Sequence, residues 1–435
     1  MNKIFLLAVV LLVVFTGCAT DDEYVAKDMR VKMNCRTRSI DEAADFAENA
    51  ISMLDSKETR SGCLRVLDRH KAVKCITNRN SRSSAIDTLM YVFNYENNAG
   101  FSVISAVPCT EPVLMVAEEG NYDPEVKSSV EGFDLYVDRL KSYLSGIVFP
   151  PGGITIEDRD TVLTGRMKPI NDTIVRQLPA QINLRWGQDN PYGNLCPNGI
   201  SGCVNTAIGM IMAHFHAPAT MTFNFDKAHA GTRQIDWNLV NQHIGTNYCY
   251  DYNHQGDSII ACIMRQLGYE NRSTYYTNGI GTSTVSSMAL DNLTNIHGLT
   301  HTPQMRYDSG DNYKAMLDAG NICYVSGREE NAAMGHAFIL DGYKDLIHRF
   351  YNCNVYNIIS NGRVVGEYLE PVSGGESPVA EYWHINWGGD GWSNGYYYKG
   401  VFCVGELQEA DPGVPHDGNN RHDYGYSVFF SFIHD

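Results

Sequence analysis

The pattern of hydrophobic and polar residues begins with an apolar run from Ile4 to Phe15, which follows a short start that contains Lys3. About twelve apolar residues are too few to cross a bilayer comfortably as a permanent helix, whereas a positive start and a short apolar core are typical of an export signal. No later segment of the sequence is apolar enough to span a membrane. We therefore expect residues 1–17 to be a signal peptide.

The apolar run ends at Cys18, within the sequence Phe15-Thr16-Gly17-Cys18. This segment resembles a bacterial lipobox, in which a small residue precedes a cysteine that is lipidated and becomes the mature N-terminus. Residues 18–38 would then be a polar tether, and an exported chain would meet the outer membrane or cell surface only through its lipid, unless processing releases the mature domain. The alternative is an ordinary secretory signal with an accidental cysteine, since Phe15 stands where an aliphatic residue is usual.

Helical and strand periodicities alternate between residues 39 and 150. Apolar residues at spacings of three and four predict a helix that begins at Ser39 and another within 130–147. Short apolar stretches around a turn rich in Asn and Gly predict three strands, at residues 89–95, 101–106 and 113–117. These elements predict an N-terminal domain of mixed α+β structure over residues 39–150.

The apolar periodicity stops at Pro150-Pro151-Gly152-Gly153, and residues 151–179 are polar with several basic side chains. Such a segment is expected to be an exposed connector that contains a processing site. Beyond it lie all five Trp residues of the chain and most of its Gly-rich motifs. Residues 180–435 are therefore expected to form a second domain.

The composition is that of a globular protein, with 43% hydrophobic and 19% charged residues. A net charge of −16 and the lack of a basic stripe argue against nucleic acid as a partner, because phosphate binding requires a basic surface. Of twelve cysteines, eleven remain once Cys18 is set aside. In an oxidising compartment an odd number suggests that one thiol is kept free for chemistry, although a buried unpaired cysteine would also explain it.

Cys203 follows Gly202 and opens an apolar stretch in which Ala207, Ile208 and Ile211 share one helical face. The cysteine is therefore expected at a helix N-terminus, where partial positive charge and free N–H groups stabilise a thiolate. A thiolate is a strong nucleophile, and the same N–H groups can bind an oxyanion. A structural cysteine that caps a core helix is the alternative.

His336 lies between Gly335 and Ala337, just before the apolar stretch Phe338-Ile339-Leu340. The small neighbours leave room for the imidazole at the start of a strand. Histidine is the natural base for a thiol, and its charged form stabilises the thiolate as an ion pair. A structural histidine at a strand start is the alternative when this motif is considered alone.

Two further segments carry polar groups that such chemistry uses. A strand that contains Asn386 runs into a loop rich in Gly and Trp, which is suited to closing over an extended peptide. The Asn386 amide is a candidate to orient the histidine through one ring nitrogen. Gln188, fifteen residues upstream of Cys203, is a candidate side-chain donor to an oxyanion.

Together these segments resemble the streptopain family of papain-like cysteine peptidases. The matching residues are Trp186 to Tyr192, Gly202-Cys203-Val204, Thr206-Ala207, Gly335 to Phe338, Asp341-Gly342-Tyr343, His384 and Asn386-Trp387-Gly388. The resemblance implies an α+β fold, with a papain-like peptidase domain of two lobes preceded by an α+β prodomain. In papain-like folds the cysteine helix belongs to one lobe and the histidine and asparagine strands to the other.

The resemblance also implies a role for each residue. The implied catalytic residues are Cys203 as nucleophile, His336 as general acid and base, Gln188 as oxyanion donor, and Asn386 with Trp387 as support for the imidazole. The residues expected to bind substrate are Trp387, Gly388, Gly389 and Gly335. His384 is a second candidate base because it shares a strand face with Asn386, but the resemblance favours His336. No cofactor is implied.

The likeness extends to the N-terminal domain. Ser105-Ala106 and Glu111-Pro112-Val113-Leu114 match a pattern in the prodomains of that family. Residues 39–150 are thus expected to block the site until they are cleaved away. The expected partners are protein or peptide substrates and the chain's own prodomain.

A zinc site is disfavoured. Its candidate ligands are Cys196, Cys203, His214 and His216. The two histidines, two residues apart on a helix, point in different directions, and no paired C-x-x-C accompanies them.

The sequence therefore predicts a lipid-anchored cysteine endopeptidase made as a zymogen, which works through a thioester acyl-enzyme. An acyltransferase or amidase with the same Cys-His pair would instead transfer acyl groups without net proteolysis. A non-catalytic surface lipoprotein is the third possibility, and the presence of every expected catalytic residue counts against it.

Overall fold

The computed structural model describes residues 38–55, 59, 62, 64–67, 73–76, 88–107, 110–148, 165–242, 255–277, 281–306, 313–329, 335–360, 363–402 and 426–435. The chain divides into two compact units, Met1–Asn34 and Cys35–Asp435, and every described residue belongs to the second. The expected signal peptide, Cys18 and the expected tether up to residue 37 lie outside the described residues. Within the described residues, no helix is both long and apolar enough to span a bilayer.

The N-terminal domain, residues 38–148, contains the helices and strands that its periodicity predicts. Its helices are α1 (Ile40–Ala50) and α2 (Glu131–Val148), and its strands are β1 (Val73–Ile76), β2 (Thr88–Asn94), β3 (Phe101–Ser105) and β4 (Val113–Ala117). Helix α1 begins where a cap is expected, since Ser39 Oγ accepts a hydrogen bond from the Glu42 N–H at 3.2 Å.

Strands β2 to β4 are buried on both faces. Successive side chains of a strand point to opposite faces. Accordingly, Phe93 packs in the apolar cluster that contains Phe46 of α1, whereas Val92 packs in the cluster that contains Phe133 of α2. The two helices thus cover opposite faces of one sheet, which explains why these strands are apolar at nearly every position.

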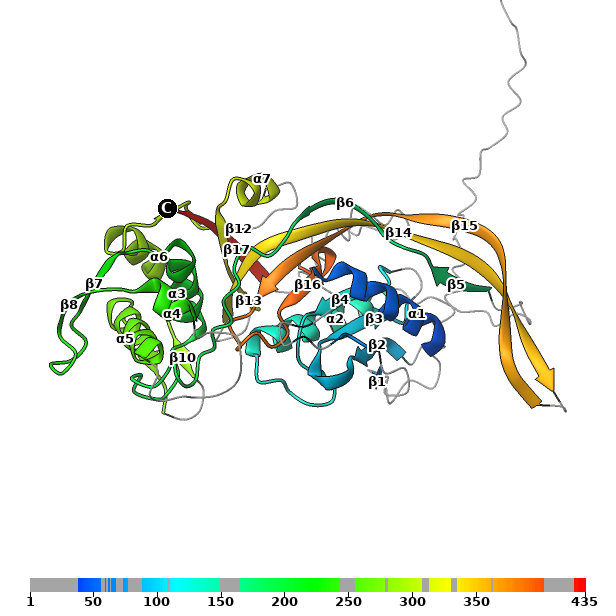
Figure 1. Ribbon diagram of the computed structural model, residues 1–435, viewed down its shortest axis with the longest axis horizontal. Coiled ribbons are helices and arrows are strands. Elements are labelled where there is room, and N and C mark those ends of the chain that lie inside the picture. The colour runs from blue at the N-terminus through cyan, green and yellow to red at the C-terminus, as the bar shows by residue number, and fades with distance from the viewer. Residues whose placement is uncertain are drawn as a thin grey trace, which may run out of the picture. The chain divides into compact units, whose positions relative to one another are not determined.

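The sheet of the N-terminal domain continues without a break into the rest of the chain. Its strand order is β1-β2-β3-β4-β16-β15-β14-β13-β17-β11, and β4 pairs antiparallel with β16. The added strands are β11 (Thr300–His301), β13 (Ile322–Glu329), β14 (Gly335–Ser360), β15 (Arg363–Asn386), β16 (Gly395–Tyr398) and β17 (Tyr426–His434). Figure 1 shows β4 and β16 next to each other, although almost 280 residues separate them in the chain.

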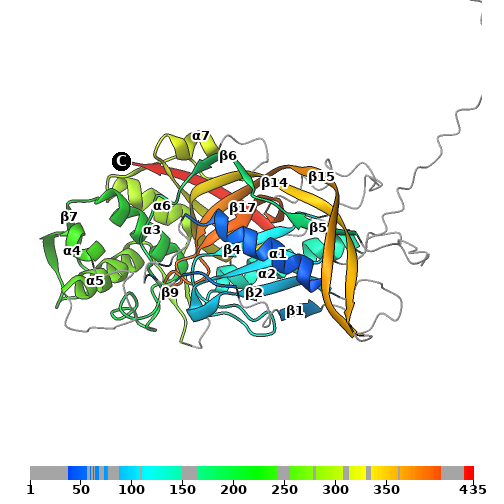
Figure 2. The same cartoon turned by 45° about the vertical axis from the view of Figure 1, so that its right-hand side comes forward.

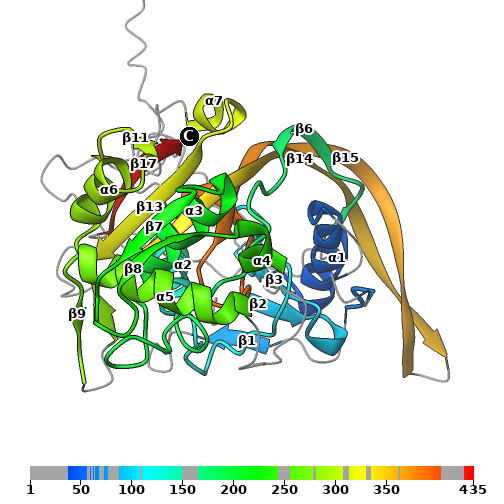
Figure 3. The same ribbon diagram turned by 60° about the vertical axis from the view of Figure 1, so that its left-hand side comes forward.

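Four of the helices that the structure describes follow the N-terminal domain in the chain and precede the long strands of the sheet. They are α3 (Cys203–Phe215), α4 (Trp237–Gln242), α5 (Gln255–Glu270) and α6 (Ser286–Asn295). They gather around α3, whose residues from Val204 to Ala213 are all buried, and Figure 3 shows α3 behind α5 and beside β13. A helical lobe against a lobe built on the sheet is the α+β arrangement that the sequence predicts.

Strands β14 and β15 form a long antiparallel hairpin with several irregularities in its register. Two edge strands, β5 (Gly165–Pro169) and β6 (Thr173–Leu178), pair with β14, and α1 packs beside β5 (Figure 2). The segment expected as an exposed connector is therefore described only from residue 165, where it forms strands. The side chains from Ile174 to Gln177 are exposed.

The remaining elements are short. They are β7 (Thr220–Phe223), β8 (Gly231–Gln234), β9 (Thr274–Tyr275), β10 (Thr282–Ser283), β12 (Met305–Arg306), α7 (Tyr313–Asp318) and the 3₁₀ turns η1 (Ile51–Met53), η3 (Glu96–Asn98) and η4 (Lys399–Val401).

Candidate active site

Cys203 is the first residue of α3, as its sequence context predicts. Gly202 precedes it with φ +88°, a conformation that favours glycine. The half-buried thiol thus lies at the helix N-terminus, where the backbone N–H groups have no partner within the helix and the helix dipole favours negative charge.

His336 lies at the start of β14 and is only 2% exposed. Its Nε2 donates a hydrogen bond to the backbone carbonyl of Trp387 at 3.1 Å. Its other ring nitrogen, Nδ1, is buried and has no hydrogen-bond partner among the residues that the structure describes. The ring is therefore fixed through one nitrogen, and the other is left for proton transfer.

The thiol of Cys203 and the imidazole of His336 shift each other toward the charged form. Burial opposes the thiolate, but the charge of His336 outweighs it and lowers the pKa of the Cys203 thiol. Burial also opposes the imidazolium, but the Cys203 charge and the Trp387 carbonyl raise the pKa of His336. Opposite shifts of this kind favour a thiolate–imidazolium pair.

Asn386 does not bond the histidine, which corrects the expectation that its amide orients the ring directly. Its Nδ2 donates to the Leu184 carbonyl at 2.7 Å, and its Oδ1 accepts from the Gly388 N–H at 3.1 Å. These bonds fix the backbone on both sides of Trp387. Asn386 therefore supports the imidazole only indirectly, through the carbonyl of Trp387.

Gln188 lies in a segment that is tied to the start of α3. Its backbone carbonyl accepts hydrogen bonds from the N–H of Ser201 at 2.9 Å and from Ser201 Oγ at 3.2 Å. The side chain is half-buried. The backbone of Gln188 is thus tied to Ser201, two residues before Cys203, which keeps the Gln188 segment next to the start of α3.

The Gly-rich loop that follows β15 packs against α3. A Cβ at Gly388, where φ is +70°, would lie 3.2 Å from Cγ2 of Thr206. Gly335, beside the histidine, is exposed. The residues expected to bind substrate therefore flank the Cys203–His336 pair from the loop and from β14.

His384, the alternative base, has another role. Its Nδ1 lies 2.6 Å from Oδ1 of the buried Asp341, and its Nε2 lies 3.4 Å from Oε1 of Glu118. Burial opposes its charged form, but Asp341 and Glu118 together raise the pKa of His384 to about 10. A histidine that stays charged and paired in this way is unsuited to accept a proton from a thiol at neutral pH.

The N-terminal domain covers the site. A Cβ at Gly132, in the first turn of α2, would lie 2.6 Å from Nε2 of His336, and one at Gly389 would lie 2.6 Å from Cγ2 of Val130. The backbone of α2 therefore rests on the imidazole, and Val130 rests on the Gly-rich loop. Sequence analysis did not single out Gly132; the signal was a glycine inside a predicted helix, where it is unfavourable relative to alanine.

Carboxylates of the N-terminal domain also pair with buried cations beyond residue 180. The pairs are Asp55 with Lys344 at 2.7 Å, Glu111 with His348 at 2.7 Å, Glu118 with His384 at 3.4 Å, and Glu119 with Arg185. Each cation is at most 8% exposed. The two parts of the chain therefore share a charged and largely desolvated contact.

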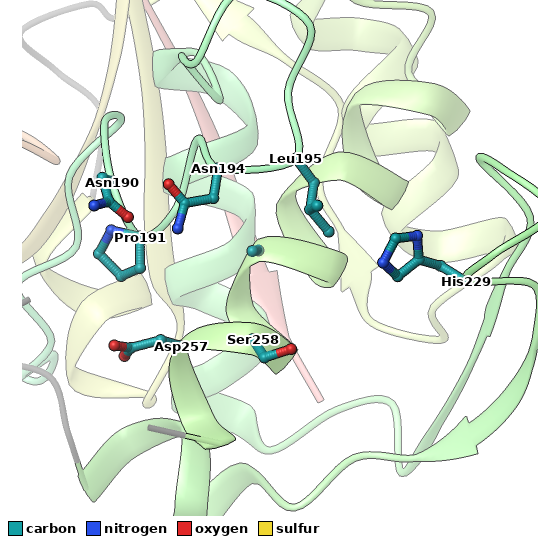
Figure 4. A pocket seen from close by; sticks show the side chains of 8 residues that line it. Asn190, Pro191, Asn194, Leu195, His229, Asp257 and Ser258 are labelled. Atoms are coloured by element: carbon teal, nitrogen blue, oxygen red, sulfur yellow. The ribbon is translucent and has the colours of Figure 1, made fainter. Parts of the chain in front are cut away.

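A separate cavity of about 210 Å³ lies in the helical lobe. Figure 4 shows Asn190, Pro191 and Asn194 on one side of it and Asp257 on the other; its remaining lining residues are Leu195, His229, Ser258 and Ala261. None of the expected catalytic residues lines this cavity, so it is distinct from the site at Cys203.

Five cysteines of the described residues are free thiols, and they are Cys196, Cys203, Cys262, Cys323 and Cys353. All but Cys203 are buried, and burial raises the pKa of three of them (Cys196, Cys262 and Cys323). The odd number of cysteines therefore does not identify a single free thiol. Cys203 differs from these three thiols because its pKa is lowered rather than raised.

Two family models match the chain. Residues 186–397 match the Peptidase C10 family, and residues 33–143 match the Spi protease inhibitor. Streptopain of Streptococcus pyogenes is 22% identical over 345 residues, which cover 71% of this chain and 73% of streptopain. The thiol protease/hemagglutinin PrtT of Porphyromonas gingivalis is 22% identical over 380 residues, which cover 79% of this chain and 36% of PrtT.

Among solved structures, a fragment of Prevotella intermedia prointerpain A matches with a TM-score of 0.47 at 16% identity, covering 82% of this chain and 98% of that one. Active interpain A from the same organism matches with a TM-score of 0.36 at 18% identity, covering 60% of this chain and 95% of that one.

An inhibitor model followed by a peptidase model defines a cysteine-type peptidase that is made as a zymogen with an inhibitory prodomain. Residues 186–397 belong to the C10, or streptopain, family of cysteine peptidases. The expected family, enzyme class and fold class are thereby confirmed. Residues 38–148 are called the prodomain below, and residues 180–435 the peptidase domain.

Proposed function

We propose that the chain is an exported, lipid-anchored cysteine endopeptidase that becomes active when cleavage in the segment 151–179 releases its prodomain. The observation that carries this proposal is the mutual influence of Cys203 and His336, each of which shifts the pKa of the other toward its charged form. A thiolate next to an imidazolium is the resting state that attack on a peptide carbonyl requires.

The acylation step uses both groups. The Cys203 thiolate attacks the peptide carbonyl carbon, so that a C–S bond forms and the carbonyl oxygen gains negative charge. The N–H groups at the start of α3 and the amide of Gln188 are placed to donate to this oxygen. His336 then gives its Nδ1 proton to the departing amine as the C–N bond breaks, which leaves a thioester.

The deacylation step reverses these roles. Neutral His336 accepts a proton from water as the water oxygen attacks the thioester carbon. The C–S bond then breaks, the new carboxyl product leaves, and the thiolate–imidazolium pair is restored. Throughout the cycle the Trp387 carbonyl holds Nε2–H, so Nδ1 is the nitrogen that exchanges the proton.

The prodomain supports an inhibited precursor. Gly132 lies against the imidazole that must transfer the proton, and Val130 lies against Gly389, where substrate binding is expected. A peptide substrate therefore has to displace the start of α2. The natural substrates of such an enzyme are proteins or peptides.

The test of catalysis is the substitution Cys203→Ala in the full chain, with Cys262→Ala as a matched control at a buried free thiol. We expect C203A to fold, to remain uncleaved and to leave casein intact, and C262A to process itself and to cleave casein. Undiminished proteolysis by C203A would contradict the proposal. Products capped by an added amine, without new carboxyl termini, would indicate the acyltransferase alternative instead.

Anchoring through Cys18 is a separate part of the proposal, supported by the resemblance of Phe15 to Cys18 to a lipobox. We expect the full chain to partition into detergent and the C18S variant to remain in the aqueous phase, with C35S as the control. Equal partitioning of C18S and the unchanged chain would show that the anchor is wrong while leaving the catalytic proposal intact.

A further inference from the structure

Two segments of the peptidase domain lie side by side next to the active site. One is residues 184–189, which contains Gln188, and the other is residues 386–391, at the start of the Gly-rich loop. The Asn386 amide bonds the first segment at 2.7 Å, and the backbone N–H of Asp390 donates to the Trp186 carbonyl at 3.2 Å. Because these hydrogen bonds join the two segments, a movement of the loop also moves the segment that contains Gln188.

The loop carries the carboxylate of Asp390, which lies close to the carboxylate of Asp189 in the first segment. A Cβ at Gly187 would lie 2.6 Å from Cγ of Asp390, so the Asp390 carboxyl rests on the backbone next to Gln188. Burial, followed by the like charge of Asp189, raises the pKa of Asp390 to about 6. Among the described residues, neither carboxylate forms an ion pair.

Asp390 is also held in an unusual backbone conformation, with φ +56°. Residues other than glycine adopt this region rarely, although aspartate is among those that do so most often. The loop therefore keeps a carboxylate at this place despite the strain and despite the nearby charge of Asp189. Such an arrangement suggests that a cation is used there in another state of the protein.

Arg185 also packs on this loop, and its charge is paired with carboxylates of the prodomain. Its stem packs on Gly391, where a Cβ would lie 2.7 Å from Arg185 Cδ. Its guanidinium pairs with Glu119 and lies 4.0 Å from Glu118. The side chain is 8% exposed. Removal of the prodomain takes away both carboxylates and leaves Arg185, which packs on Gly391, without these partners next to the loop that carries Asp390.

We propose that Arg185 is a positioning residue that exchanges partners on activation, from Glu118 and Glu119 of the prodomain to Asp390 and Asp189 of the peptidase domain. A guanidinium bonds carboxylates through a planar fork, so it can bridge the loop and the Gln188 segment. The buried carboxyl of Asp390 lies near the like charge of Asp189, so a cation that becomes available next to the loop stabilises both carboxylates. This inference rests on the proposed function in one respect, namely that the prodomain is released.

The test is a double-mutant cycle in the matured enzyme, with Arg185→Gln, Asp390→Asn and the double variant. We expect each single change to lower kcat/KM for a peptide substrate about 10-fold, mainly through kcat, and the double variant to be no worse than the poorer single variant. Arg185→Lys should restore activity in part. Arg349→Gln, which removes an exposed pair with Glu376, is the matched control and should leave kcat/KM unchanged.

The pH profile separates positioning from a merely structural role. With Arg185 replaced, the carboxyl of Asp390 has only Asp189 as a charged neighbour, so activity should change with an ionisation near pH 6 that is absent in the unchanged enzyme and in the double variant. Independent losses that multiply in the double variant, or single variants with full activity, would overturn the proposal.

The same double-mutant cycle can be measured by thermal unfolding of the matured domain, which does not depend on peptidase activity. Coupled changes in Tm for Arg185→Gln and Asp390→Asn support the exchange, and additive changes overturn it. If the unchanged matured protein had no peptidase activity, the proposed function would fail, and this second measurement would still decide whether Arg185 bonds Asp390.

Discussion

Gly132 of the prodomain and His336 of the peptidase domain are in direct contact, so closely that any side chain at position 132 would overlap the imidazole. The backbone of helix α2 thus covers the imidazole, and the charge of Glu131 in the same turn acts on both Cys203 and His336. The thiol is not covered in the same way, since its side chain remains half-buried. Inhibition is therefore directed at the group that must move a proton.

Gly132→Ala should weaken inhibition. Alanine favours a helix more than glycine does, so α2 itself should not be destabilised, but the added methyl group must displace either the helix or the ring. Overpacking of this kind costs roughly 1–3 kcal/mol, which corresponds to a factor of about 5 to 150 in the balance between closed and open precursor. We expect faster self-processing of the full chain, measured by the appearance of the mature band over time.

Ser142→Ala on the exposed side of α2 is the control for that experiment, since the Ser142 hydroxyl donates to the carbonyl of Asp138 in its own helix. It should process at the rate of the unchanged chain. Slower processing of Gly132→Ala would mean that the α2 backbone does not restrain the imidazole.

Asn386→Ala should lower kcat of the matured enzyme by about 10- to 100-fold with little change in KM. The substitution removes the bonds to Leu184 and Gly388, each worth about 1 kcal/mol or more when buried, and so loosens the Trp387 carbonyl that holds His336. Trp387→Phe keeps this carbonyl and should retain more activity. Steady-state kinetics decide, and a larger loss of kcat in Trp387→Phe would show that the indole matters more than the backbone.

The attachment of the prodomain should depend on pH through His348. Burial opposes its charged form, but Glu111 and Asp172 raise the pKa of this ring to about 10. A raised pKa stabilises the folded state fully below about pH 6.5, the ordinary value for histidine, and this contribution is lost as pH rises toward 10. The free energy of unfolding of the full-length C203A protein should therefore fall between those values.

His348→Gln should flatten that dependence, and Glu111→Gln should lower the free energy of unfolding by about 3–5 kcal/mol because it leaves a buried charge with fewer partners. His434→Gln, at an exposed position, is the control. Urea unfolding at a series of pH values measures all three, and an unchanged pH dependence in His348→Gln would exclude this histidine as its source.

Local patterns predicted the elements and the positions of the two central residues. Gly202 followed by Cys203 and an apolar helix predicts a thiol at a helix start, and small residues around His336 predict an imidazole at a strand start, because both depend only on neighbours in the chain. The helices and strands of the prodomain follow for the same reason.

Features that depend on distant parts of the chain were not predictable in this way. The partner of His336 is the main-chain carbonyl of Trp387, and every residue has a carbonyl, so the sequence pointed to the Asn386 amide instead. The pairing of β4 with β16 and the contact of Gly132 with His336 arise from packing between segments some 200 or more residues apart. Counting cysteines failed because several buried thiols remain unpaired.

The most direct test of the account is the rate at which an alkylating agent modifies Cys203 in the matured enzyme as a function of pH, compared between the unchanged protein and His336→Gln. The paired thiolate should react well below about pH 8.5, the pKa of an ordinary thiol, which is protonated and unreactive at such pH values. His336→Gln should shift the reaction to alkaline pH. Identical profiles for the two proteins, both rising only at alkaline pH, would contradict the thiolate–imidazolium pair.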